Sequence, residues 1–390
     1  MTRARVAALA AGTGHVLVHA APALLLAWFA GGQQALGRID AGLAIPWLMP
    51  GALLLAWRVR DRTRAAQGAA VAAAIAGLLL LQLMLHLLLG GRAGGASLLV
   101  TALAGGICCA LAAVLVARAR RWRAAARWPA LLAAAALAFA AGQGLLAWGA
   151  APRIAEPRLK LAILTGLPLR WNGGGGDLAA MLASGPSDAP ALAALERRFD
   201  VRLVDSLAGV PPGEALLVAH PRALAPHDLV ALDARARRGA PTVILADALS
   251  SWPPPHPLGD PRNPPVTSLL TPLLDHWGLT LALPAPARRG EVAVFVDPGG
   301  ARLRLHSAGR FTALPGHCRA YGGGLVAQCR LAGAGGAVWL VGDADMLHDG
   351  LWRSPFDAAP WLRRSDNIAW LAGRLGGAGD RAAFAPIWIR

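Results

Sequence analysis

The residues best suited to bind a cation lie together near the carboxyl end of the chain. Asp343, Asp345, His348 and Asp349 follow directly after the apolar run 338–341, which is typical of a β-strand. Carboxylate oxygens are the preferred ligands of Mg²⁺ and Ca²⁺, and an imidazole adds affinity for a transition metal. Aspartates in turns, however, also accept hydrogen bonds from backbone N–H groups. We favour this structural role and predict no bound metal and no other cofactor.

Four consecutive glycines, Gly173, Gly174, Gly175 and Gly176, form a candidate anion-binding loop, since glycine lets backbone N–H groups approach a phosphate closely. The run lacks a following Gly-Lys-Ser/Thr, and Leu178 stands where the G-x-G-x-x-G fingerprint needs glycine. We therefore interpret it as a flexible loop. The sequence contains no Walker A motif elsewhere, so any ATPase that works with this chain must be a separate polypeptide.

Side chains for a hydrolytic relay are present in the middle of the chain. A hydroxyl, an imidazole and a carboxylate can form a nucleophile relay, and His220, His227, Asp247 and Ser250 supply these groups. The serine does not lie in a G-x-S-x-G elbow, the turn that exposes such a nucleophile. We therefore predict no catalytic residue.

The four cysteines divide into two pairs. Cys108 and Cys109 lie in a long apolar run and are interpreted as small packing residues. Cys318 and Cys329 flank a pair of glycines that can form a hairpin turn, which would place the two cysteines opposite each other on adjacent strands. We predict a disulfide between them in an oxidising compartment.

The elements that carry these residues fall into two different halves. The chain has 390 residues, of which 55% are hydrophobic, and almost all of its long apolar runs lie before Ala150. A helix that crosses a membrane needs roughly 17 to 25 apolar residues. Five such spans are predicted in a transmembrane domain of residues 1–150, at about 6–30, 43–57, 68–90, 96–116 and 129–150. Polar residues within them, such as Gln82 and His86, are expected to face the interior of the helical bundle.

Arginines between the predicted spans indicate how the chain is oriented. Eleven lie before the first span or after the second and fourth, namely Arg3, Arg5, Arg58, Arg60, Arg62, Arg64, Arg118, Arg120, Arg121, Arg123 and Arg127. The other two loops hold only Arg38 and Arg92. Under the positive-inside rule, the amino terminus is cytoplasmic, and five spans put the rest of the chain in the periplasm. We predict a multi-pass protein of the bacterial inner membrane.

The same arginines contribute most of the net charge of +16. They occupy short loops beside membrane spans and do not form a stripe on a folded face. The lipid bilayer is therefore their expected partner, and we predict no nucleic-acid binding.

The second half is predicted to be an α/β domain. Residues 151–157 form a linker, and residues 158–390 form the periplasmic domain. Apolar strands, at about 158–165, 201–204, 215–219 and 242–246, alternate with helical segments. In the clearest helix Pro226 lies in the first turn and Gly239 follows the end. Such alternation predicts a doubly wound, mainly parallel sheet.

Several motifs in this half resemble a known family. Residues 214–247 run from an apolar strand through a His-Pro turn and a leucine-containing helix to a second strand that ends in aspartate. Leu-Leu-Asp-His-Trp-Gly follows at 273–278, Val-Gly-Asp-Ala-Asp at 341–345 and Asn-Ile-Ala-Trp at 367–370. Over roughly residues 158–376 the chain resembles the GldG-like auxiliary domain of gliding-motility-type ABC transport systems.

This resemblance implies a class I glutamine amidotransferase-like fold, with a flavodoxin-like sheet, that has lost its catalytic cysteine. His220-Pro221 stands where an amidotransferase has that cysteine.

We therefore expect a non-enzymatic, membrane-anchored auxiliary component of an ABC-type transport or cell-envelope system. Its spans would contact a permease that works with a separate ATPase, and its outer domain would bind an envelope protein or glycan. The alternative is a metal-dependent envelope hydrolase that uses Asp343, Asp345 and His348.

Overall fold

The computed structural model describes residues 37–170, 188–254, 256–257, 259–331, 336–377 and 385–389. The chain divides into two compact units with a boundary at Ala151 and Pro152. The second unit comprises the described residues of Pro152–Ala358 and Leu362–Gly379, and the first contains the rest. The predicted span at 6–30 and the glycine run Gly173–Gly176 lie outside the described residues.

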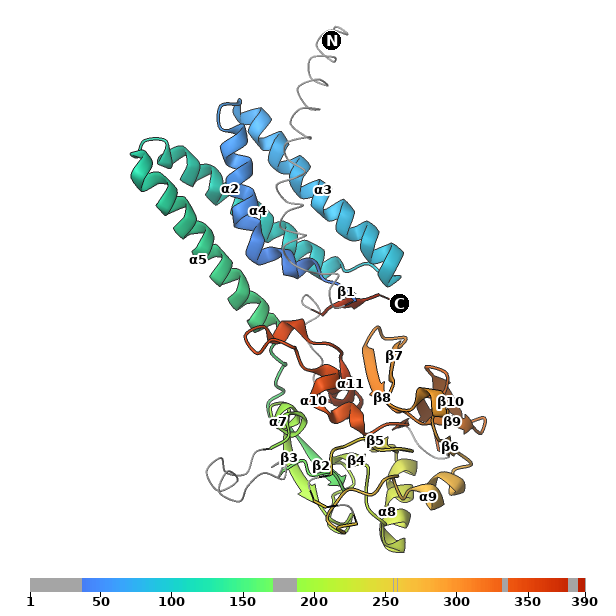
Figure 1. The fold of residues 1–390 in the computed structure, drawn as a ribbon. Coiled ribbons are helices and arrows are strands. Elements are labelled where there is room, and N and C mark those ends of the chain that lie inside the picture. Colours follow the sequence, from blue (N-terminus) through green and yellow to red (C-terminus); the bar gives the residue numbers. More distant parts are fainter. Residues whose placement is uncertain are drawn as a thin grey trace, which may run out of the picture. The chain divides into compact units, whose positions relative to one another are not determined.

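The described part of the first unit contains four helices that are long and apolar enough to cross a membrane (Figure 1). They are the continuous pair η2 (Ala41–Trp47) and α2 (Leu48–Val59), followed by α3 (Arg64–Gly90), α4 (Gly95–Ala119) and α5 (Ala124–Ala150). Each contains one of the predicted spans from the second onward. The second is longer than predicted because the Asp40 carboxylate accepts a hydrogen bond of 3.0 Å from Gly42 N–H and starts the helix before Pro46.

Side chains of these helices are distributed as in a membrane protein. Leu80, Leu88 and Leu137 are 66%, 71% and 73% exposed, whereas Gln82 and His86 are fully buried. A water-soluble bundle would bury its leucines and expose its polar side chains. The inverted arrangement fits a lipid environment, and the prediction that Gln82 and His86 face the interior is confirmed.

The carboxyl end of the chain belongs to the first unit, which differs from the predicted domain of residues 158–390. Strand β13 (Ile387–Trp388) pairs antiparallel with β1 (Arg38–Ile39), and the Arg38 Nη1 atom donates a 2.7 Å hydrogen bond to the Trp361 carbonyl. The physical reason is burial, since Ile387 and Trp388 are only 5% and 1% exposed. A two-residue strand is too short for any periodicity to reveal it.

The second unit is built on a seven-stranded sheet in the order β10-β11-β12-β5-β4-β2-β3. The parallel strands are β2 (Leu159–Thr165), β3 (Phe199–Val204), β4 (Ala215–Ala219), β5 (Thr242–Leu245) and β12 (Val338–Val341). Strands β11 (Val326–Cys329) and β10 (Cys318–Tyr321) extend it in antiparallel fashion. The predicted α/β fold with a mainly parallel, doubly wound sheet is therefore confirmed. From β2 the chain adds β3 on one side of the sheet and β4, β5 and β12 on the other, so the topological switch point lies between β2 and β4.

Helices cover both faces of this sheet. In β2, Leu161 and Ile163 pack into a core shared with α7 (Pro190–Glu196) and α11 (Asn367–Arg374). The alternate residues Ala162 and Leu164 pack into the core beneath α8 (Pro226–Arg237) and α9 (Thr271–His276). A stretch that is buried on both faces needs apolar residues at every position, which explains the apolar run 161–164.

Short elements extend the second unit beyond the predicted ones. Strand β6 (Thr280–Ala282) pairs with β9 (Arg310–Ala313), and β7 (Val292–Val296) pairs with β8 (Arg302–His306). The short helices of this unit are η3 (Pro286–Arg288), η4 (Asp345–Leu347) and α10 (Asp349–Trp352). Helix η5 (Pro360–Leu362) lies at the boundary, with Pro360 and Trp361 in the first unit and Leu362 in the second.

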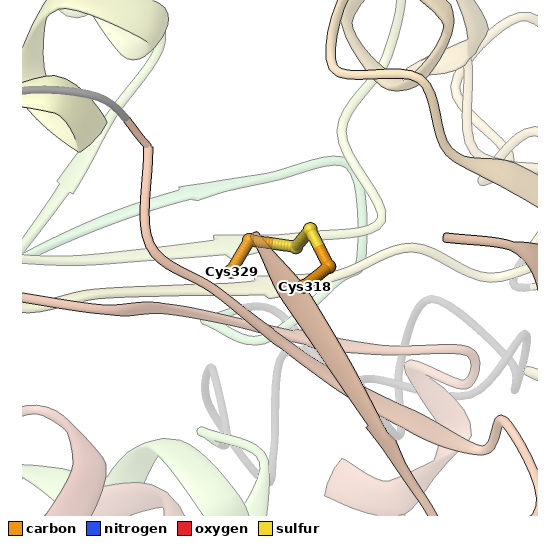
Figure 2. Close-up of a disulfide and its surroundings, with 2 residues drawn as sticks. All are labelled: Cys318 and Cys329. Carbon is orange, nitrogen blue, oxygen red and sulfur yellow. A yellow bond between two sulfur atoms is a disulfide. The ribbon is translucent and has the colours of Figure 1, made fainter. Parts of the chain in front are cut away.

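Cys318 and Cys329 are joined by a disulfide, in the pairing that the sequence predicts (Figure 2). They are direct partners in the register of β10 and β11. The hairpin turns at Gly322, Gly323 and Gly324, all of which have positive φ angles that a residue with a side chain rarely adopts. The bond therefore anchors the antiparallel edge of the sheet.

Candidate functional site

Three aspartates converge at the carboxyl edge of the parallel sheet. Asp247 follows β5 and Asp343 follows β12, each two residues beyond the paired positions Leu245 and Val341. Asp345 begins the next turn, η4. Each of these three residues, here called the acidic trio, offers a carboxylate oxygen within 4.8 Å of the others. All three are buried, with exposures of 0%, 0% and 3%.

Backbone N–H groups hold the first two carboxylates of the trio. The Asp343 oxygens accept 2.7 Å hydrogen bonds from the N–H groups of Asp345 and His306. The Asp247 oxygens accept from Leu249 N–H at 2.9 Å and from Ala344 N–H at 3.4 Å. Asp247 is thus oriented by the turns after β5 and β12, and Asp343 by the turn after β12 and the end of β8.

The third carboxylate, Asp345, is held by the loop after β5. It accepts a hydrogen bond of 2.7 Å from Ser251 N–H and one of 3.2 Å from the Ser250 hydroxyl. Ser250 is therefore a donor to the trio and is not presented as a nucleophile. This arrangement supports the structural role that the sequence analysis favoured for Asp345.

Burial changes the acidity of the trio. It raises the pKa of Asp343 well above its usual range, and the neighbouring Asp247 and Asp345 carboxylates raise it further. Burial and then the charge of Asp345 raise the pKa of Asp247 to about 8. Burial also raises the pKa of Asp345, against hydrogen bonds from Ser251 and Ser250 that lower it. Near neutral pH Asp247 therefore keeps a proton that an exposed aspartate releases, unless a cation takes its place.

Two histidines adjoin the trio. His220 Nδ1 lies 3.9 Å from an Asp247 oxygen, and His306 Nδ1 lies 3.7 Å from an Asp345 oxygen. The His220 side chain is fully buried, and its Nε2 is bonded to the Pro265 carbonyl at 2.6 Å. A carbonyl only accepts, so Nε2 carries the proton and Nδ1 keeps its lone pair.

Among the described residues, His220 Nδ1 has no hydrogen-bond partner. Burial lowers the pKa of this histidine, which disfavours a second proton. The trio thus faces one unshared nitrogen lone pair.

His220 also occupies the sharp turn at the end of β4. Its φ angle is +46°, in the left-handed region, and its carbonyl accepts a 3.1 Å hydrogen bond from Gly166 N–H in the loop after β2. A Cβ atom on Gly166 would lie 2.8 Å from that carbonyl oxygen, so this close approach requires glycine. The turn shares its left-handed φ angle with a nucleophile elbow, but residues 221–225 separate it from α8, and it carries an imidazole in place of a thiol or hydroxyl.

The other predicted site residues lie apart from the trio. His348 caps α10 by accepting a hydrogen bond of 3.3 Å from Gly350 N–H, and its ring packs against Trp252. Asp349 lies 3.5 Å from His348 Nδ1 and is half exposed. His227 is exposed beside Asp228. The structure therefore brings Asp343 and Asp345 together with Asp247, and the predicted ligands His348 and Asp349 are not members of this group.

Fold and site together define a membrane-anchored α/β protein with a buried carboxylate cluster at the edge where such sheets bind ligands. No family model, curated protein or solved structure matches the chain.

Proposed function

We propose that the protein is a non-enzymatic, membrane-anchored binding component of an ABC-type transport or cell-envelope system. In this proposal its helices contact a permease that works with a separate ATPase. Its α/β domain recognises a component of the envelope. The protein lies in the bacterial inner membrane with a cytoplasmic amino terminus and a periplasmic α/β domain.

The main support is the side chain at the turn after β4. Enzymes with this kind of sheet expose a nucleophile at that turn, whereas His220 is fully buried and bonded to the Pro265 carbonyl. The carboxylates beside it are buried, and those of Asp343 accept hydrogen bonds from backbone N–H groups. A substrate has no direct access to either group, and this favours binding over catalysis.

The proposed orientation has two supports, one in each unit. The disulfide between Cys318 and Cys329 suits an oxidising compartment. Strand β13 pairs with β1, which precedes the second predicted span. The positive-inside rule puts this loop outside the cytoplasm, so one orientation accommodates both observations.

Site-specific cross-linking tests the proposal. A photo-cross-linking residue at Leu132, which is 69% exposed on α5, is expected to capture a membrane permease in cells that produce the full-length chain. The same residue at Leu55, which is 1% exposed, is the matched control and should capture nothing. When permease and ATPase are reconstituted in liposomes, ATP hydrolysis should fall severalfold if the chain is omitted. A chain that captures no permease, or an ATPase indifferent to it, contradicts the proposal.

The acidic trio favours a second candidate, a metal-dependent envelope hydrolase. Three carboxylates within 4.8 Å, with the unshared Nδ1 of His220 beside Asp247, form a set of oxygen and nitrogen donors suited to a divalent cation. In this alternative Asp343 and Asp345 are ligands, and Asp247 takes the place that the sequence analysis gave to His348.

Metal analysis separates the two candidates. The hydrolase requires stoichiometric metal in the purified full-length chain, lost on Asp343→Asn and retained on Asp349→Asn, which leaves the trio intact. The binding component requires no such metal. Envelope substrates hydrolysed by the chain but not by Asp343→Asn would establish the second candidate and remove the first.

A further inference from the structure

A second candidate site lies in the first unit, among the helices that are long enough to cross a membrane. It is a cavity of about 380 Å³ between helices α2, α3 and α4. Its wall is formed largely by small apolar side chains, including Ala52 and Ala56 of α2, Val71 of α3 and Ala113 and Ala117 of α4. We call it the interhelical cavity. It shares no residue with the acidic trio, which belongs to the second unit.

The cavity opens on the side of α4. Ala113 and Ala117 are exposed and lie four positions apart, so they occupy the same face of the helix. On α2, Ala52 is buried and Ala56 is half-buried at the same spacing. An apolar space that stays empty forfeits van der Waals contacts over its whole lining. An unbranched acyl chain fits a narrow groove between small side chains and restores those contacts.

One end of the cavity is strongly basic. Arg60 follows the last residue of α2, and Arg120 and Arg121 follow α4; all three line the cavity. Asp61 lies among them, with one oxygen 3.3 Å from Arg60 Nε and the other 3.3 Å from Arg120 Nη2. Three guanidinium groups and one carboxylate leave a net charge of +2. This end of the cavity therefore favours an anion.

The arginines keep donors for that anion. A guanidinium has five N–H groups, and the ion pairs with Asp61 use one on Arg60 and one on Arg120. Arg60 uses one more on the Trp57 carbonyl, at 2.7 Å. The side chains of Arg60 and Arg120 are 32% and 53% exposed, and Arg121 is exposed as well. The fork of N–H groups matches the oxygens of a phosphate, which a guanidinium binds through two parallel hydrogen bonds.

Tryptophans place this end of the cavity at the surface of a bilayer. Trp57 and Trp128 are neighbours, with ring centroids 5.2 Å apart, and the Arg60 guanidinium lies 4.3 Å from the Trp57 ring centroid. An indole prefers the boundary between lipid headgroups and hydrocarbon. The arginines are therefore at the depth of the lipid phosphates. From Arg60 back to Ala52 the cavity follows α2 for about 12 Å, which is most of one leaflet, whose hydrocarbon is about 15 Å thick.

We propose that the interhelical cavity binds one anionic phospholipid, in the leaflet on the side of the arginines. The lipid phosphate binds Arg60, Arg120 and Arg121, and one acyl chain lies along the wall that Ala113 and Ala117 form. A zwitterionic headgroup is disfavoured, because its ammonium group would meet the same positive charges. In the proposed orientation this is the cytoplasmic leaflet. Such a site goes beyond the proposed function, because it requires only that the helices lie in a bilayer.

Native mass spectrometry of the full-length chain tests this site. The chain is released from lipid nanodiscs that contain phosphatidylglycerol and phosphatidylethanolamine in equal amounts. One phosphatidylglycerol should remain bound per chain, enriched about tenfold or more over phosphatidylethanolamine. Arg121→Gln should lower this enrichment about fivefold, because it removes one arginine from the phosphate. Arg118→Gln removes an exposed arginine in the last turn of α4 that does not line the cavity, and it should leave the enrichment unchanged.

A second pair of variants tests the acyl chain and keeps the experiment valid if Arg121→Gln fails to fold. Ala113→Phe fills the wall of the cavity and should abolish retention of the lipid. Ala110→Phe, at an exposed position of α4 outside the cavity, is its control and should retain the lipid. Equal retention of the two lipids, or phosphatidylglycerol retention that survives both Arg121→Gln and Ala113→Phe, overturns the proposal. Displacement of the lipid by excess inorganic phosphate also overturns it, because the site would then bind phosphate without an acyl chain.

Discussion

The pH dependence of stability offers a direct test of the acidic trio, through Asp247. Burial and the neighbouring Asp345 raise the pKa of Asp247 from 3.8 to about 8 in the folded chain. Between these values the folded state holds a proton that the unfolded state has released. Stability is therefore greatest at the acidic end of this window and falls as the pH rises toward 8.

The window from pH 6.5 to pH 8 isolates this effect from that of His220. Burial lowers the pKa of His220, so its contribution to stability grows as the pH rises toward the ordinary histidine value of about 6.5 and is constant above it. Across the chosen window, ionisation of Asp247 alone lowers the free energy of unfolding by about 1 to 2 kcal/mol. The raised pKa values of Asp343 and Asp345 act in the same direction.

Thermal unfolding of the full-length chain, followed by tryptophan fluorescence in EDTA, measures this cost. For a unit of this size, a loss of about 1 to 2 kcal/mol corresponds to an apparent Tm that is lower by about 2 to 8 °C at pH 8 than at pH 6.5. Asp247→Asn cannot ionise and should show a smaller fall. Asp275→Asn, at an exposed position on α9, should behave as the parent chain. A Tm that is constant or rises across the window, or an unchanged slope in Asp247→Asn, refutes the reasoning.

Adding Mg²⁺ extends the same experiment. A divalent cation bound by the trio would keep the carboxylates ionised and remove the loss of stability at pH 8. An unchanged curve is the result expected for the non-enzymatic binding component, in which the trio is structural.

Two further predictions concern particular contacts, and a third concerns the proposed topology. Replacing Cys318 with serine should destabilise the second unit by about 3 kcal/mol, because the disulfide closes a short loop with a sequence separation of 11; an intact-mass increase of about 2 Da on reduction checks the bond. Trp388→Ala should cost about 3 kcal/mol and expose the carboxyl end to carboxypeptidase, since Trp388 is 1% exposed in β13; resistance equal to that of the parent chain contradicts the pairing with β1. Alkaline phosphatase, which is active only in the periplasm, should be active when it is fused after Arg390. Activity of a cytoplasmic reporter alone at the same position contradicts the proposed topology.

The membrane helices were predictable because their pattern is strong and local. Each of the described spans is an apolar run of sufficient length, and it needs no knowledge of distant residues. The parallel strands were recognisable for the same reason. The pairing of β1 with β13 was not, because it joins residues about 350 positions apart through two residue pairs. Its stabilisation comes from burial of Trp388, which is a property of the folded chain.

The acidic trio was only half predictable. Asp343 and Asp345 are neighbours in sequence, and their position after an apolar strand pointed to them. Asp247 stands at the same offset after β5, yet its proximity depends on β5 and β12 being adjacent in the sheet. His348 was assigned by sequence distance alone, and the turn through η4 instead carries it to the start of α10.

A rule for reading such sheets follows from this comparison. Parallel strands that are paired end at the same edge, so polar residues at equal offsets beyond two apolar strands become neighbours whenever those strands are adjacent. Asp247 and Asp343, each two residues beyond a paired position, satisfy that rule. Residues that merely follow one strand in sequence, such as His348 and Asp349, have no such constraint. The strand order, which topology decides, is therefore the missing step between a list of chemically capable residues and a site.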